Sequence, residues 1–306
     1  MEPRRESPSG WHLYSLYRGC PRSWYLKYIQ GLKYRYTGKA LIFGGIIHNA
    51  LEAYYSSNLS IEKALEIFYE EINSRKGEYE REDAFLKDLE EGPLMLKYYD
   101  SKWRDLDLKN WEILELEKQH TIFFGPDNRF KLTVRCDRVI RDKELKKIYP
   151  VEMKTTRYSI PAMFTSTEMD DQVTSYIWAL QKVHPEWDID SCLIDILYKR
   201  NSVIDAQRPG FVTRGKRELM IFEMELLGTI LEVSQKVKTL ESIPHPFLFP
   251  ANRDHCKKFG CPFDKICRVN LKPDEIPPMY EKDSWKKEME EEMKGIQDFK
   301  LEDFVK

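Results

Sequence analysis

An acid and a base stand two residues apart in the stretch VEMKTT, residues 151–156. Side chains alternate along a β-strand, so Glu152 and Lys154 would point to the same side of a strand that ends here. Asp137 precedes Glu152 by fourteen intervening residues that include a polar turn at 142–146, which suits two neighbouring antiparallel strands. Because such strands lie about 5 Å apart, the sequence predicts two carboxylates and an ammonium at one place.

This grouping predicts metal-assisted hydrolysis of a phosphodiester. Two carboxylates can share a hard divalent cation, with water and phosphate oxygens completing its coordination. Such a cation lowers the pKa of a bound water and neutralises the transition state. Lys154 would orient or deprotonate the attacking water and add positive charge near the phosphate. A glutamate and a lysine two residues apart also occur on ordinary edge strands, so the interpretation needs further residues.

Two helical pairs supply further residues of suitable chemistry. His48 and Glu52 stand at i and i+4 in the stretch GGIIHNALE, and His48 could be a neutral ligand for Mn²⁺ or Mg²⁺. Gln172 and Tyr176 have the same spacing after the predicted strand, and they could brace Lys154 or hold a phosphate. Each pair alone is more typical of a structural role.

The elements that must position these residues follow from the hydrophobic period. A helical segment at 11–30 is expected to break at Pro21. Helices are predicted at 41–58, 60–81, 83–106 (interrupted at Gly92-Pro93), 168–183 and 218–240. Strands are predicted at 112–124, 128–141, 147–154, 191–199 and 211–217, with a hairpin turn at Asp127-Asn128. The order predicts an α/β core in which helices cover a small mixed sheet.

The order G-x-x-x-H, D, E-x-K, Q-x-x-x-Y resembles the RecB-like branch of the PD-(D/E)XK nuclease superfamily over roughly residues 40–200. The matching residues are Gly44, His48, Asp137, Glu152, Met153, Lys154, Gln172 and Tyr176. The resemblance implies a restriction-endonuclease-like αβββαβ core. It also implies a Mg²⁺ or Mn²⁺ ion held by His48, Asp137, Glu152 and the main-chain carbonyl of Met153, with Lys154 as the catalytic lysine. Cys136 stands where the family often has proline.

Three of the six cysteines lie close together near the end of the chain, at 256, 261 and 267. Three thiols this close suggest a metal or a cluster, and a fourth ligand is then needed. Cys20, far away in sequence, is the natural candidate. The alternatives are Zn²⁺ with four cysteines, Zn²⁺ with three cysteines and His255, and buried thiols without metal. Cys136 and Cys192 are expected in the core of strands.

The cysteine arrangement resembles Cas4 proteins and AddB-type nucleases, which have one cysteine before the core and three after it. The resemblance implies a [4Fe–4S] cluster held by Cys20, Cys256, Cys261 and Cys267. The family usually has a shorter gap between the first two of the last three cysteines than the four residues found here. The aromatic residues around Cys20 would shelter such a cluster.

The expected domains are an N-terminal segment (1–40), a nuclease core (41–242) with a helical insertion at about 60–107, an iron–sulfur loop (243–275) and a charged tail (276–306). The 42% hydrophobic and 33% charged content is that of a globular protein, and the net charge of −2 gives no global attraction for nucleic acid. No apolar run of about 18 residues and no secretory signal are found. A cytoplasmic location is expected, in a host cell if the protein is viral. No G-x-x-x-x-G-K-[ST] loop is present, so no ATP hydrolysis by that route is expected.

The leading hypothesis is therefore a metal-dependent DNA exonuclease with a structural [4Fe–4S] cluster, acting on single-stranded ends in recombination, repair, phage replication or CRISPR adaptation, with partner proteins of those pathways. The alternatives are a structure- or sequence-specific endonuclease of the same fold and a non-catalytic DNA-binding adaptor. A strand channel could be lined by the aromatic residues near Cys20 and by basic residues. The basic candidates are Arg22, Lys27, Lys199, Arg200 and Arg214.

Overall fold

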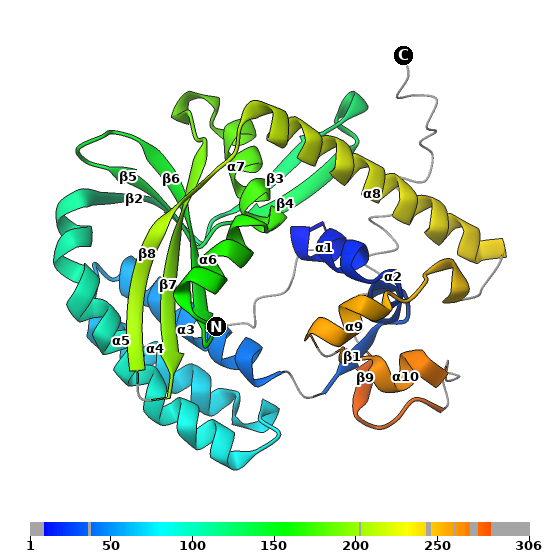
Figure 1. The fold of residues 1–306 in the computed structure, drawn as a ribbon, viewed down its shortest axis with the longest axis horizontal. Coiled ribbons are helices and arrows are strands. Elements are labelled where there is room, and N and C mark those ends of the chain that lie inside the picture. The colour runs from blue at the N-terminus through cyan, green and yellow to red at the C-terminus, as the bar shows by residue number, and fades with distance from the viewer. Residues whose placement is uncertain are drawn as a thin grey trace. The chain divides into compact units, whose positions relative to one another are not determined.

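A five-stranded mixed sheet contains the strand that carries Glu152 and Lys154 (Figure 1). In spatial order its strands are β2 (Trp111–Leu116), β5 (Arg138–Asp142), β6 (Ile148–Thr156), β7 (Ser191–Arg200) and β8 (Val203–Thr213). β6 and β7 are parallel, and the other neighbouring pairs are antiparallel. The structure is a computed structural model, and it describes residues 9–35, 38–201, 203–242, 246–259, 261–269 and 275–282.

Helices cover both faces of the central strands. Met153 of β6 packs into an apolar core formed with α3 (Lys39–Ser56), α4 (Ile61–Ser74) and α5 (Glu82–Asn110). Its neighbour Lys154 instead contacts Gln172 of α7 (Asp171–Val183). Because successive side chains of a strand point to opposite faces, α3–α5 and α7 lie on opposite sides of β6. Both strands are buried along almost their whole length, and polar residues within them, such as Glu152 and Asp195, are buried as well.

The order α3, β2, β5, β6, α7, β7 confirms the predicted α/β fold, a restriction-endonuclease-like αβββαβ core with a mixed sheet. α4 and α5 stand between α3 and β2, where the helical insertion was expected. The parallel pair β6–β7 requires a crossover, and α6 (Ile160–Glu168) and α7 provide it. The sequence interpretation missed α6, although Pro161 in its first turn is a helix-start signal.

The predicted interruption at Gly92-Pro93 is wrong, because α5 runs through both residues. A Cβ on Gly92 would lie 2.1 Å from Cε2 of the fully buried Phe68 on α4. The glycine therefore permits close packing of α4 on α5. Pro93 inside the helix removes one backbone hydrogen bond and destabilises the helix by about 3 kcal/mol. The packing of α4 against α5 around Phe68 has to offset this cost.

Two predicted strands are each divided in the structure. The predicted strand at 112–124 becomes β2 and β3 (Gln119–Phe124), and the one at 128–141 becomes β4 (Phe130–Arg135) and β5. β3 and β4 form a separate two-stranded sheet, joined at the predicted turn. The chain changes direction at Glu117, where φ is +47°. Alternation of side chains continues on both sides of such a bend, so the pattern alone does not reveal it. The predicted last strand at 211–217 is also misplaced, since β8 ends at Thr213.

The chain divides into two compact units. The described residues of Met1–Arg35, Thr121–Thr133 and Met220–Lys306 form one, and those of Tyr36–His120 and Val134–Leu219 form the other. The five-stranded sheet with α3–α7 belongs to the second unit. Every expected nuclease residue lies in that unit, and every expected cluster cysteine lies in the first.

The first unit joins the N-terminal segment to the cysteine-rich segment. Its helices and strands include α1 (Trp11–Gly19), α2 (Pro21–Trp24), a π-helix (Tyr25–Ile29), β1 (Leu32–Tyr34), most of β3 and β4, most of α8 (Lys216–Ser242), α9 (Arg253–Phe259), α10 (Asp264–Val269) and β9 (Tyr280–Lys282). The helix expected at 11–30 does break at Pro21, which begins α2. The loop expected at 243–275 is wrong in part, because it contains α9 and α10. Of the expected charged tail, 283–306 lies outside the described residues.

β1 and β9 pair antiparallel, with Leu32 opposite Lys282. Trp24 is fully buried and stacks on Phe249 at 5.6 Å between ring centroids. These contacts hold the start of the chain against its last described segments. Over the part of the chain that the structure describes, none of the helices combines the length and apolar character needed to span a membrane.

Candidate active site

Strand pairing brings the two expected metal-binding carboxylates together. Asp137 directly precedes β5, and the register pairs its neighbour Arg138 with Val151, the residue before Glu152. The main-chain N–H of Met153 donates a hydrogen bond to Asp137 Oδ2 at 2.6 Å. Asp137 and Glu152 therefore occupy adjacent positions on neighbouring antiparallel strands, as the turn between them predicted.

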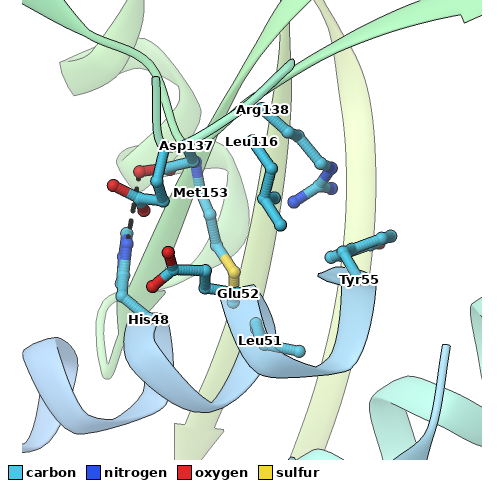
Figure 2. A pocket seen from close by; sticks show the side chains of 9 residues that line it. His48, Leu51, Glu52, Tyr55, Leu116, Asp137, Arg138 and Met153 are labelled. Atoms are coloured by element: carbon cyan, nitrogen blue, oxygen red, sulfur yellow. Dashed lines mark hydrogen bonds and ion pairs between the residues drawn. The ribbon is translucent and has the colours of Figure 1, made fainter. Parts of the chain in front are cut away.

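His48 reaches the same place from α3. Its Nδ1 lies 3.4 Å from Asp137 Oδ1. Figure 2 shows the small pocket that they line, with His48 and Glu52 pointing from one helix toward Asp137 and Met153. Helical spacing of i and i+4 explains why His48 and Glu52 face the pocket together.

Lys154 and the α7 residues form a chain of polar contacts. Lys154 Nζ forms an ion pair with Glu152 Oε1 and donates a hydrogen bond to Gln172 Oε1 at 3.0 Å. Gln172 Nε2 in turn donates to the hydroxyl of Tyr176 at 2.7 Å. Asp170 caps α7 by accepting from the N–H of Gln172 at 2.9 Å, which fixes the first turn of the helix. The structure thus brings together all the expected nuclease residues.

The electrostatics of the site follow from burial and from its opposite charges. Burial, reinforced by Asp137, raises the pKa of Glu152, although Lys154 opposes this effect. Burial also acts against the charged form of Asp137, but His48 and the Met153 N–H lower its pKa below the ordinary value. For His48, burial is outweighed by Asp137, Glu152 and Glu117, so its pKa is raised. Closely spaced carboxylates whose pKa values shift in opposite directions are a feature of functional sites.

Glu117 is a functional candidate that the sequence interpretation missed. His48, Glu117 and Asp137 each offer a ligand atom, and these atoms lie within 4.8 Å of one another. The Glu117 N–H donates to the main-chain oxygen of Asp137 at 3.0 Å, and Arg135 Nε lies 3.2 Å from the Glu117 carboxylate. Two acids and one imidazole are ligands that suit Mn²⁺ or Mg²⁺, so the residues present fit a divalent cation. No motif marks Glu117, because its place depends on the bend after β2.

The expected cluster cysteines converge within the first unit. The N–H of Asn252 donates to the sulfur of the buried Cys20 at 3.4 Å, which links Cys20 to the segment leading into Cys256. Ser23 Oγ lies 3.3 Å from the sulfur of Cys261. Burial raises the pKa of Cys267, and the nearby thiols of Cys20 and Cys261 add to this effect.

The other two cysteines occupy the core of the second unit. Cys136 and Cys192 are 3% and 0% exposed, as expected for strand residues that act as small apolar side chains. Burial raises the thiol pKa of both far above the usual value, which leaves them unreactive.

Several residues expected to line a strand channel have structural contacts instead. Lys199 is buried, and its Nζ lies 3.1 Å from the Glu91 carboxylate on α5. Arg214 donates to Thr174 Oγ1 and to the main-chain oxygen of Glu168. Arg22 Nε donates to the main-chain oxygen of Phe249. The aromatic residues near Cys20 are buried as well, namely Tyr14, Tyr17, Trp24 and Tyr25. These side chains are used in one ion pair, in hydrogen bonds and in the apolar core, and the stacking surface predicted around Cys20 is wrong.

Comparison with known proteins gave one family and a set of solved structures. The family model described as the PD-(D/E)XK nuclease superfamily matches residues 12–268. A solved structure titled "Crystal structure of SSO0001" is 17% identical, covers 85% of this chain and 96% of its own, and superposes with a TM-score of 0.34. Among curated proteins, no significant match was found.

Proposed function

Because the chain belongs to the PD-(D/E)XK nuclease superfamily, we propose that it is a metal-dependent deoxyribonuclease that hydrolyses DNA from a single-stranded end. We place it in the RecB-like branch with the Cas4 and AddB-type enzymes, acting in the cytoplasm. The observation that carries the proposal is the convergence of His48, Asp137, Glu152 and Lys154 from one helix and two paired strands.

His48, Asp137, Glu152 and the Met153 carbonyl would hold Mg²⁺ or Mn²⁺, with Glu117 as an additional ligand. The cation would supply positive charge next to the scissile phosphate and would make a bound water more acidic. The carboxylates are suited to this role because strand pairing fixes them before any ligand arrives, so little ordering cost remains on binding.

Lys154 supplies the second positive charge of the site. Burial disfavours its ammonium, but Glu152 and the neighbouring acids raise its pKa. The ammonium would orient the attacking water and stabilise negative charge on the phosphate. Gln172 holds the ammonium through its Oε1, and Tyr176 fixes the amide of Gln172. We assign these two as positioning residues.

A [4Fe–4S] cluster bound by Cys20, Cys256, Cys261 and Cys267 is the second part of the proposal. What supports it is that segments far apart in sequence bring the thiols together: the N–H of Asn252 donates to the sulfur of Cys20 at 3.4 Å, and the nearby thiols of Cys20 and Cys261 act on the pKa of Cys267. Such a cluster takes four cysteine ligands. Its role would be to fasten the N-terminal segment to the cysteine-rich segment.

The test combines metal analysis with DNA cleavage in one anaerobic preparation. Iron and zinc content and the visible spectrum identify the cofactor, with about four irons per chain expected. Single-stranded DNA labelled at the 5′ or the 3′ end, beside a closed circular strand, is then incubated with Mn²⁺ or Mg²⁺. The proteins compared are wild type, Lys154→Ala and the control Lys147→Ala, a change at an exposed lysine on the turn before the same strand.

Trimming of one labelled end, lost only in Lys154→Ala, is the expected result. Cleavage of the circular strand would instead identify an endonuclease. Iron without cleavage of any DNA would point to a non-catalytic adaptor, and zinc in place of iron would overturn the cluster while leaving the nuclease intact. The pathways that fit are recombination, repair, phage replication and CRISPR adaptation, each of which produces single-stranded ends.

A further inference from the structure

We propose that Glu115, His120 and His184 form a second metal site, separate from the nuclease site, that binds Zn²⁺ or a similar transition-metal cation. All three residues belong to the second unit. Glu115 lies on β2, His120 is near the start of β3, and His184 is the residue after α7.

The three side chains converge on one point. Glu115 Oε2 lies 2.7 Å from His120 Nε2, and Glu115 Oε1 lies 3.3 Å from His184 Nε2. The ligand atoms of all three lie within 4.8 Å of one another. Zn–N and Zn–O bonds of about 2.0–2.2 Å place neighbouring tetrahedral ligands about 3.4 Å apart, close to the separations found here. Small side-chain movements would therefore complete the coordination.

The ligand types select the kind of cation. Two imidazoles and one carboxylate are ligands for zinc and for divalent iron, cobalt or nickel. Mg²⁺ and Ca²⁺ prefer oxygen ligands, so this site differs in metal preference from the carboxylate-rich site at Asp137. Glu115 and His120 are each 8% exposed, which makes the carboxylate costly to bury without a compensating positive charge.

Neighbouring residues hold His184 in the orientation of a ligand. Its Nδ1 lies 3.4 Å from Glu186 Oε1, and its ring stacks on Trp187 at 3.6 Å between centroids. A carboxylate at one imidazole nitrogen directs the lone pair to the other nitrogen, and this pairing is usual for metal-binding histidines. The Nε2 atom directed at Glu115 is then the free ligand.

Lys118 is a group that competes with a cation. Its Nζ donates to Glu115 Oε1 at 2.5 Å, but its side chain is 54% exposed and can move into solvent. The competing possibility is a network of Lys118, Glu115 and the two histidines without metal. The two possibilities make opposite predictions for removal of the Lys118 charge.

A cation bound by Glu115, His120 and His184 would restrain segments that carry nuclease residues. Glu115 lies near the end of β2, two residues before Glu117 at the bend, and α7 presents Gln172 and Tyr176 toward Lys154. A cation joining the bend after β2 to the end of α7 would restrain both. Its role is structural and its binding can be measured without DNA.

The experiment measures Zn²⁺ binding to the full chain by equilibrium dialysis and calorimetry, after removal of loosely bound metal with a chelator. Asp137→Asn is the common background, so that Zn²⁺ at the nuclease site does not enter the comparison. The variants added to it are His120→Gln, Glu186→Gln and Lys118→Gln. We expect one Zn²⁺ per chain to be lost in His120→Gln and affinity to fall about tenfold in Glu186→Gln.

Lys118→Gln keeps the proposal testable if His120→Gln fails to fold, because Lys118 is exposed. A metal site predicts Zn²⁺ affinity about two- to fivefold higher in this variant, since a competing half-exposed ion pair is removed. It also predicts a melting temperature that rises on addition of Zn²⁺. Unchanged Zn²⁺ stoichiometry in His120→Gln, or unchanged affinity in Lys118→Gln, would overturn the proposal. Neither result depends on whether the protein cleaves DNA.

Discussion

Replacing Gln172 by methionine should slow DNA cleavage about 10- to 150-fold and leave substrate affinity nearly unchanged. The amide oxygen of Gln172 accepts from Lys154 Nζ at 3.0 Å, and this contact orients the ammonium beside its ion-pair partner Glu152. A hydrogen bond to a charged group contributes about 1.5–3 kcal/mol. About 1.36 kcal/mol of activation free energy corresponds to a tenfold change in rate. If the transition state needs this contact, losing about 1.5–3 kcal/mol slows cleavage about 10- to 150-fold.

A double-mutant cycle tests whether Gln172 acts through Lys154. The assay compares kcat and KM on end-labelled single-stranded DNA with Mn²⁺ for wild type, Gln172→Met, Lys154→Ala and the double variant. Methionine has a similar length and keeps the packing of the half-buried position. Gln181→Met is the matched control, since Gln181 lies on the same helix and donates to the main-chain oxygen of Ile189, away from the site.

If Gln172 only positions the lysine, the double variant should be no slower than Lys154→Ala alone. Two rate losses that multiply would refute this reasoning, because Gln172 would then contact the substrate independently. An unchanged kcat in Gln172→Met would refute it as well, and would show that Glu152 alone positions the ammonium.

Three other changes test the packing, the metal site and the buried charges. Gly92→Ala should lower the free energy of unfolding by about 1–3 kcal/mol, because the added Cβ would meet Phe68 at 2.1 Å. Urea unfolding measures this change. Gly228→Ala is the control and should be neutral or stabilising, because a Cβ there meets nothing within 4 Å. Glu117→Gln should weaken Mn²⁺ binding about tenfold or more in calorimetry, and unchanged affinity would remove Glu117 from the ligand set. Asp195→Asn should lower the free energy of unfolding by about 3–5 kcal/mol at pH 7, because it leaves two buried arginines without their carboxylate partner. These arginines outweigh the effect of burial and lower the pKa of Asp195. A lowered folded-state pKa stabilises the protein above the unfolded value of about 3.9, so the difference between wild type and variant should shrink as pH falls below about 4; a constant difference in unfolding experiments at pH 3 and pH 7 would contradict the assignment.

The local order of the nuclease residues was predictable because it depends on short-range geometry. Glu152 and Lys154 share a strand, and the helical pairs keep a spacing of four residues, so period alone predicts which side chains point the same way. The pairing of Asp137 with Glu152 followed from a short polar turn between apolar segments. α3, α7, β6 and β7 were all predicted close to their observed bounds for the same reason.

Two of the misses concern places where the chain bends or where distant segments meet. The breaks near Glu117 and Asp137 lie inside segments that alternate without interruption, so the pattern showed two strands where the structure has four. Gly92-Pro93 indicated a break, but packing of Phe68 against Gly92 keeps the helix whole. Local preference is weak compared with burial, and burial is decided by partners far away in sequence.

The sequence by itself determined the α/β class, the acid and base on one strand end, and the residue types of two clusters. Only the tertiary structure decided that Glu117 joins His48 and Asp137, and that Lys199 is used in an ion pair inside the core. The physical reason is the distance along the chain over which each property is decided. Periodicity reports the direction of side chains within one element, whereas a metal site or a buried ion pair depends on where separate elements come to lie against one another.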